Sequence, residues 1–482
     1  MKIYLVSLVA AIFASMYYFR VNIIERLTVS NKEEIKKLTY WPVLLNQWNE
    51  NDNLRSMKRV FDRLGYKMVD GSKEHWDIMW SLEFPFDRFP EMIMPIKPNQ
   101  KINHFPASPF IGNKRAFVTS VNSEYVLPAF SFPRDQGKFQ KYIKENPNAR
   151  FVEKNFDNRG VQLVSIEAIQ NGLDNPNKFV QVFLENPLLI DGHAFDIGMY
   201  VLITSIDPLV IYRYKPECLF RFCSEPYHPF DPKNLNKYVV GEDKKHAWDM
   251  KTFQHLEGHF DFHNLDIFKN YLANNGHDVE AIFKKFDDSI VEAVTSKIKQ
   301  IVAATQQECK KFQCTNDNFF ELFRFDFMVD EKLNVYLMEI NMSPNMTPAK
   351  KEFERNQIHY EQVIYNTLRL VGVEGFTELK EELRNSQIYS SPQNIAIDAQ
   401  ACSECDDKCE AESCYLCLPC MSTDEREYLQ KFYREHNRRG EFKRIFPSAA
   451  SVNNENLATF SEKTQRLAVW LSGKCEMDYE WC

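Results

Sequence analysis

The chain of 482 residues is long enough for more than one domain, and 44% hydrophobic residues are sufficient for a large core. This composition, with 26% charged residues, excludes a disordered protein, a collagen-like fibre and a bundle of membrane helices. The net charge of −8 provides no general positive field for nucleic acid, so we expect no nucleic-acid partner.

The N-terminal segment Ile3–Phe19 has no charged residue and lies between Lys2 and Arg20. A span of about 17 residues is the lower limit for a membrane helix, and aromatic residues at one end are typical of an interfacial belt. Residues 1–20 are therefore predicted to be a membrane anchor or signal segment. The anchor reading makes this a single-pass membrane protein, with the side of the membrane undecided, and a packed core helix is a further alternative.

The sequence that follows predicts a mixed α/β fold. Residues 21–75 have the pattern of helices with charged faces, and residues 84–126, rich in Pro and Phe, that of short strands and turns. Apolar and β-branched runs predict strands at Phe151–Val152, Val161–Val164, Phe179–Leu184, Phe195–Thr204 and Leu209–Tyr214.

A long helix is predicted where apolar residues repeat at steps of three and four from Phe283 to Ile301. Two strands, Leu322–Val329 and Val335–Ile340, follow and are joined by the turn Asp330–Asn334. Residues 389–401 are predicted to be a linker, and residues 402–482 a cysteine-rich and helical tail.

The 12 cysteines are unevenly distributed. Cys218/Cys223 and Cys309/Cys314 are close in sequence, Cys475 and Cys482 lie near the end, and six more fall between Cys402 and Cys420. The C-x-x-C steps of this last group suit a zinc site in a reducing compartment or disulfides in an oxidising one. The membrane segment favours disulfides, and neither reading implies catalysis.

The strongest chemical signal is the predicted pair of strands between Phe320 and Pro344. Alternation puts Asp326 on one face of the first strand, and Glu339 and Asn341, two residues apart, on one face of the second. A hairpin brings these three oxygen-bearing side chains together. Such a set suits Mg²⁺ when substrate phosphates complete its coordination, and an acidic strand end that binds nothing is the alternative.

A nucleotide triphosphate beside such a metal would require cations. Lys114, Lys154 and Arg221 lie within or just beyond strand-like runs, and the planar guanidinium of Arg221 suits a phosphate or carboxylate. Each of them, taken alone, is more often a solvated surface charge than a ligand contact. Asp196 is an acid among apolar neighbours, which favours a specific role.

Four segments of the chain resemble successive blocks of the tubulin–tyrosine ligase-like family, and they keep its order and spacing. They are INHFPASPFIGNKRAF, FVQVFLENPLLIDGHAFDIGMYVLITSIDPLVIY, RFCSEPY and FELFRFDFMVDEKLNVYLMEINMSP. A fifth, EHNRRGEFKRIFP, resembles the block that follows the catalytic domain in glutamylating members. The resemblance implies an ATP-grasp fold, with ATP between two lobes, over residues 76–388. It also implies ATP- and Mg²⁺-dependent ligation of glutamate to tubulin side chains through an acyl phosphate, with microtubules as the partner.

The resemblance also implies roles for single residues. Asp326, Glu339 and Asn341 fall on magnesium ligands, and Lys114 and Lys154 on lysines that contact phosphates. Gln181 falls in the segment that touches adenine. Asp196 matches the aspartate of a K-F-D-x-R motif and Arg221 an arginine near the phosphates, so Lys154, Arg221 and Asp196 are the predicted catalytic residues.

The chain departs from the family pattern at several cations. Ala194 and Gly198 stand where the motif has lysine and arginine, Val182 replaces a lysine, and Arg324 replaces a glycine before the metal aspartate. Charge-assisted contacts contribute about 1.5–3 kcal/mol each, so the losses bear directly on activity. Three hypotheses follow: an active tubulin polyglutamylase, an inactive relative that binds tubulin or regulates active enzymes, or a lumenal protein with disulfides that no longer meets tubulin.

Overall fold

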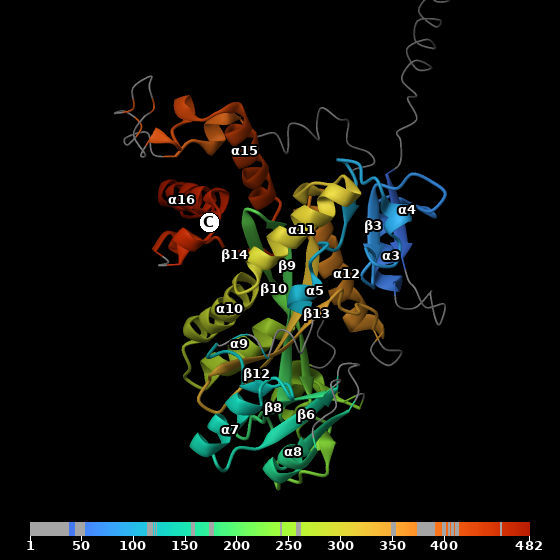
Figure 1. Ribbon diagram of the computed structural model, residues 1–482, viewed down its shortest axis with the longest axis vertical. Coiled ribbons are helices and arrows are strands. Elements are labelled where there is room, and N and C mark those ends of the chain that lie inside the picture. Colours follow the sequence, from blue (N-terminus) through green and yellow to red (C-terminus); the bar gives the residue numbers. More distant parts are fainter. Residues whose placement is uncertain are drawn as a thin grey trace, which may run out of the picture.

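The computed structural model describes most of the chain after residue 37. The described residues are 38–43, 54–112, 119, 121, 123–155, 160–172, 178–241, 243–256, 262–348, 353–373, 391–397, 402, 405, 409, 414–453 and 456–482. They form a mixed α/β fold with three β-sheets (Figure 1).

The central sheet is antiparallel and runs through the middle of the molecule (Figure 1). Its strand order is β11-β10-β9-β12-β13, and β14 also pairs with β10. The bounds are β9 (Phe195–Ile206), β10 (Leu209–Phe222), β11 (Lys245–His246), β12 (Glu321–Val329), β13 (Val335–Met342) and β14 (Phe442–Phe446). The strands predicted from the alternating pattern are thereby confirmed, with β10 longer than expected.

Helices α10 (Val279–Thr295) and α11 (Ile298–Phe312) share a core with one face of this sheet. Phe323, Phe325 and Phe327 alternate toward that core, and the Phe327 ring lies 5.0 Å from the ring of Phe286. The sequence predicted one helix through this region, but α10 ends at Thr295 and α11 begins at Ile298. The apolar repeat continues across the break, which is why periodicity alone did not locate it.

A second sheet, β5-β8-β6-β7, lies at one end of the central sheet (Figure 1). Its strands are β5 (Ala129–Phe130), β6 (Phe151–Asn155), β7 (Val161–Val164) and β8 (Lys178–Val182), and it carries α7 (Gln136–Glu145) and α8 (Ile166–Gly172). Phe130, Phe139, Phe151, Ile169 and Val180 form its own small core. Strands were predicted within both β6 and β7, and the two pair as an antiparallel hairpin.

The third sheet is parallel, with the order β2-β1-β3-β4. Its strands are β1 (Thr39–Val43), β2 (Lys67–Met68), β3 (Ile78–Ser81) and β4 (Lys101–Ile102), with α3 (Arg55–Arg63) and α4 (Pro90–Ile93) nearby (Figure 1). The short helix α5 (Pro109–Gly112) instead contacts β13 of the central sheet. The expectation of helices throughout 21–75 is wrong here, since β1 and β2 belong to this sheet. The aromatic residues of β1, Tyr40 and Trp41, are buried in the core, whereas both residues of β2 are exposed.

The remaining helices are α9 (Asn264–Asn274), α12 (Phe353–Leu370), α15 (Thr423–Asn437) and α16 (Glu462–Met477). Single 3₁₀ turns occur at Leu235–Lys237, Ala247–Asp249, Lys251–Leu256, Asn316–Asn318, Pro392–Ile395, Leu418–Cys420, Ala449–Asn453 and Leu457–Thr459. The predicted linker region packs onto α16 in its described part, because the indole nitrogen of Trp470 donates to the carbonyl of Ile395 at 2.9 Å.

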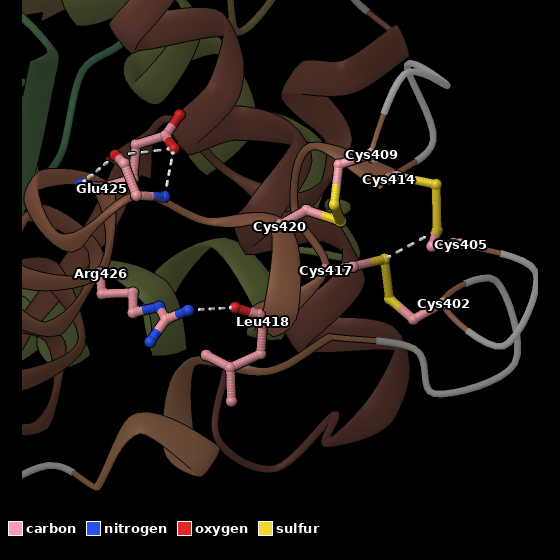
Figure 2. The surroundings of a disulfide bond; sticks show 10 residues. Cys402, Cys405, Cys409, Cys414, Cys417, Leu418, Cys420, Glu425 and Arg426 are labelled. Carbon is pink, nitrogen blue, oxygen red and sulfur yellow. Dashed lines mark hydrogen bonds between the residues drawn. A yellow bond between two sulfur atoms is a disulfide. The ribbon is translucent and has the colours of Figure 1, made fainter. Parts of the chain in front are cut away.

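The cysteine-rich segment contains three disulfides, Cys402–Cys417, Cys405–Cys414 and Cys409–Cys420 (Figure 2). Cys309–Cys314 and Cys475–Cys482 form two more, while Cys218 and Cys223 are buried thiols. Ser422 caps α15 directly after this segment, and its hydroxyl and Glu425 form a capping box. The structure therefore favours the disulfide reading over a thiolate zinc site.

The prediction of a single-pass membrane protein requires correction. Within the described part of the chain, no helix is both long and apolar enough to cross a bilayer. The segment Ile3–Phe19, on which the predicted anchor, membrane partner and membrane location rested, lies outside the described residues. The prediction rested on the length of this segment, its absence of charge and the aromatic residues at one end.

Candidate functional site

A cavity of about 370 Å³ lies between the central sheet and the second sheet, β5-β8-β6-β7, which is called the small sheet below. Strands β6, β7 and β8 contribute residues to its lining from one side, and β9, β10, β12 and β13 from the other. Six of the predicted site residues line it: Lys154, Asp196, Arg221, Asp326, Glu339 and Asn341. Volumes of about 300–1,000 Å³ are typical of sites for small molecules and cofactors.

The three predicted metal ligands meet as the hairpin pattern required. Asp326 on β12 stands opposite Glu339 on β13 in the strand register. The Asn341 amide nitrogen donates to Asp326 at 3.0 Å and to Glu339 at 2.9 Å. Rotation of this amide would present its oxygen instead, so the three side chains provide the oxygen ligands that Mg²⁺ prefers.

Asp326 is also held by arginines. Arg324 donates two hydrogen bonds to its carboxylate, from Nε at 2.6 Å and from Nη2 at 2.7 Å. Arg221 Nη2 lies 3.4 Å from Oδ2 of the same group. Because Asp326 is almost fully buried, these cations compensate its charge, and a metal ion would have to share the carboxylate with them.

The position of Arg324 explains the glycine at 198. Gly198 on β9 stands opposite Asp326 in the strand register. A Cβ atom added to Gly198 would lie 2.9 Å from Arg324 Cδ and 2.8 Å from Asp326 Oδ1. The resemblance described above implies arginine at 198 and glycine at 324, whereas this chain has Gly198 and Arg324. A guanidinium thus stands beside Asp326, supplied by β12 in place of β9.

Asp196 and Arg221 form a second ion pair in the cavity. They lie opposite each other on β9 and β10, and Arg221 donates two hydrogen bonds to Asp196, at 2.8 Å and 2.7 Å. Burial raises the pKa of Asp196, while the Arg221 guanidinium acts in the opposite direction. Paired in this way, Asp196 orients Arg221 toward Asp326, which suits a positioning role for the acid.

Lys154 on β6 approaches from the small sheet. Its ammonium group donates to the side-chain oxygen of Gln181 at 2.7 Å, and Gln181 in turn donates to the carbonyl of Leu127 at 3.1 Å. Gln181 is fully buried and does not line the cavity, so it holds Lys154 from behind. Lys114, the other predicted phosphate contact, lies outside the described residues.

The rest of the lining is largely apolar. Ala194 and Val182, which replace family lysines, present short apolar side chains to the cavity beside Phe179 and Met328. Cys223 also lines it, and burial raises the pKa of its thiol to about 12, so the group is neutral at pH 7. The cavity therefore has an apolar end and a charged end at Asp326, Glu339 and Asn341, the predicted metal ligands.

Four residues at or beside the cavity had no predicted role: Arg324, Cys223, Tyr227 and Tyr238. Arg324 was noted only as a departure from a pattern, although its place two residues before Asp326 puts it on the same strand face. That spacing could have predicted the contact between Arg324 and Asp326. The two tyrosines come from the segment after β10, where no periodic pattern exists to place them.

These features define a class of protein, a mixed α/β fold consistent with the ATP-grasp arrangement, with a charged cavity between two antiparallel sheets. A sequence profile of the tubulin-tyrosine ligase family matches residues 93–380, and the chain belongs to this family.

The similarity to individual relatives extends over most of the chain. It is 34% identical over 451 residues to the probable tubulin polyglutamylase ttll-15 of Caenorhabditis elegans, covering 89% of this chain and 84% of that protein. It is 25% identical to mouse tubulin polyglutamylase TTLL6, covering 75% of this chain and 44% of that protein. It is also 25% identical to human tubulin monoglutamylase TTLL4, covering 87% of this chain and 37% of that protein. The chain thus spans less than half of the two mammalian relatives.

Proposed function

We propose that this protein is an ATP-dependent ligase that joins glutamate to glutamate side chains of tubulin. The observation that carries the proposal is the convergence of Asp326, Glu339 and Asn341 with Arg221 and Lys154 around one cavity. Membership of the tubulin-tyrosine ligase family and the names of the relatives support the substrate class.

In the proposed reaction, ATP lies with its base at the apolar end and its phosphates at the charged end. Asp326, Glu339 and Asn341 would hold Mg²⁺, which supplies charge neutralisation and alignment for the phosphates. The acceptor carboxylate attacks the γ-phosphorus, and ADP leaves. The amine of the incoming glutamate then attacks the acyl carbon, forms the amide bond and loses a proton, and inorganic phosphate leaves.

The residues of this chain have distinct tasks in that reaction. Lys154 and Arg221 offset negative charge on the phosphoryl group as it is transferred. Asp196 keeps the guanidinium of Arg221 in one orientation through two hydrogen bonds. Arg324 neutralises part of Asp326 before nucleotide arrives, and it takes the place of the arginine that the family carries at 198.

The test is the substitution Glu339→Gln, which preserves size but removes one negative charge from the proposed metal site. Incorporation of radiolabelled glutamate into microtubules, with ATP and Mg²⁺, should fall by at least about 100-fold, since metal assistance contributes several kcal/mol. Glu331→Gln is the matched control, because Glu331 is exposed in the turn between β12 and β13. It should leave the rate unchanged.

A second candidate function rests on the buried Asp326. Two arginines already pair with this carboxylate, so its negative charge is compensated without a metal ion. Such an arrangement fits an inactive relative that binds tubulin. No incorporation by the unmutated chain, with microtubule co-sedimentation preserved, would favour this candidate. Equal incorporation by the unmutated chain and Glu339→Gln would contradict the ligase proposal.

A further inference from the structure

A second group of potential ligands lies away from the cavity and joins three distant parts of the chain. Glu217 is on β10, His263 directly precedes α9, and His359 is on α12. The side chain of Glu217 is 1% exposed, that of His359 10% and that of His263 32%. None of the three lines the cavity that holds Asp326.

Both imidazoles contact the carboxylate of Glu217, each through its own Nδ1 atom. His263 Nδ1 lies 2.9 Å from Glu217 Oε1, and His359 Nδ1 lies 3.3 Å from Oε2. The three donor atoms all lie within 4.8 Å of one another. Zinc bonds to nitrogen and oxygen of about 2.0–2.2 Å place tetrahedral ligand atoms about 3.3 Å apart, so only small movements are needed to admit an ion.

Glu217 is fixed in position by groups other than the histidines. The backbone nitrogen of Asn264 donates to Oε1 at 3.2 Å, and its side-chain nitrogen donates to Oε2 at 3.0 Å. That same amide nitrogen lies 3.0 Å from the carbonyl of Cys218. Outer partners of this kind orient metal ligands and fix their geometry. Glu217 also lies in the stretch of β10 where the register with β9 shifts, which directs side chains away from regular alternation.

We propose that Glu217, His263 and His359 form a binding site for a divalent metal ion of the zinc class. Two imidazole nitrogens with one carboxylate oxygen are a ligand set that zinc accepts, and three protein ligands leave one position open. A cavity of about 500 Å³ that includes His263 among its lining residues can supply a water molecule for that position. Metal binding requires each Nδ1 to lose its proton, which moves to Nε2 in the neutral ring.

The proposed ion would connect β10, the start of α9 and α12. Removal of the ion leaves the carboxylate hydrogen-bonded to both histidines, so the fold does not depend on it. The inference is independent of ligase activity, because the site shares no residue with the cavity.

The first test is metal binding by the full chain after treatment with a chelator. One equivalent of Zn²⁺ should bind and raise the melting temperature. Co²⁺ at the same site should show visible d–d bands without thiolate charge-transfer absorption, which distinguishes histidine and carboxylate ligands from Cys218 or Cys223. His359→Gln should weaken Zn²⁺ binding at least tenfold, while His277→Gln, at an exposed histidine, should have no effect.

A second measurement uses the unmutated chain, so its result does not depend on whether a variant folds. Diethyl pyrocarbonate should modify His263, which is about one-third exposed, and saturating Zn²⁺ should protect it, as read by peptide mass spectrometry. His277 in the same sample should remain reactive. Absence of Zn²⁺ binding, thiolate absorption with Co²⁺, or equal modification of His263 with and without Zn²⁺ would each overturn the proposal.

Discussion

At the scale of single residues, Gly198 and Arg324 on adjacent strands depend on each other. The resemblance implies arginine at 198, and Arg324 supplies a guanidinium to Asp326 from the space that a side chain at 198 would enter. Restoring arginine at 198 alone would therefore fail, since its Cβ would meet Arg324 and Asp326 at less than van der Waals distance. Ala194 and Val182 have no such compensation among the described residues that line the cavity.

This mutual dependence predicts a specific pattern of rescue. Gly198→Arg should destabilise the fold by about 1–3 kcal/mol, as overpacked sites do. The double variant Gly198→Arg/Arg324→Gly should regain stability and keep nucleotide affinity close to that of the unmutated chain. Arg324→Gly alone should weaken ATP binding at least tenfold, equivalent to about 1.4 kcal/mol. Titration calorimetry with ATP and Mg²⁺, together with melting temperatures, measures both effects.

Two outcomes would contradict this dependence. One is a Gly198→Arg variant as stable as the unmutated chain, which would mean that Arg324 moves aside freely. The other is a double variant that binds ATP no better than Arg324→Gly. Lys332→Gly, at an exposed residue of the next turn, controls for the general effect of replacing a long cationic side chain with glycine.

At the scale of elements, the sequence predicted the strands of the site well and their surroundings poorly. Asp326, Glu339 and Asn341 could be placed because a hairpin is local, and alternation then fixes the shared face. The parallel sheet of β1 to β4 depends on pairings between separate segments, which no local pattern encodes. The Glu217 cluster was missed for the same reason, since its three residues come from three distant elements.

The packing of α15 against the C-terminus predicts a pH effect. His436 on α15 is buried, its Nε2 lies 2.8 Å from the carbonyl of Trp481, and burial lowers its pKa to about 2. In the unfolded chain its pKa is about 6.5, so below that pH the unfolded state binds a proton that the folded state does not. Above about pH 6.5 His436 is neutral in both states and does not affect the free energy of unfolding. Below that pH, protonation of the unfolded chain lowers the free energy of unfolding increasingly as the pH falls.

We therefore expect the free energy of unfolding to fall by up to about 1.4 kcal/mol per pH unit below that point because of His436. Urea unfolding between about pH 7 and pH 5 measures it. His436→Gln, which can still donate to Trp481, should reduce the slope by one proton, and His277→Gln should not. An unchanged slope in His436→Gln would show that this histidine does not remain neutral.

At the scale of the whole molecule, the cysteine-rich tail is part of the catalytic fold. β14 pairs with β10 in the central sheet, Glu435 of α15 accepts hydrogen bonds from Thr204 and Tyr212, and Arg444 donates to Tyr212. Residues 402–482 were predicted to be a tail because a linker was expected before them at residues 389–401. The disulfides in Figure 2 therefore lie next to an element that is integral to the core.

This integration predicts that a tail substitution will destabilise the entire chain. Phe442 on β14 is fully buried, and its ring lies 5.1 Å from that of Tyr214 on β10. Phe442→Ala should lower the free energy of unfolding by about 3–5 kcal/mol, and calorimetry should show the main transition moving as a whole. Val469→Ala, at an exposed site on α16, is the control. Two separated transitions, with only the smaller one shifted, would contradict an integrated core.

The pairing of β10 with β14 also has a consequence for synthesis on the ribosome. β10 ends at Phe222, whereas its partner begins only at Phe442, so the strand emerges long before the segment that covers its edge. A long strand with an unpaired edge recruits other chains, and contacts between distant segments form slowly. We therefore expect the nascent protein to pass through a stage in which the sheet that carries Arg221 lacks β14, and aggregation of the chain is favoured at that stage.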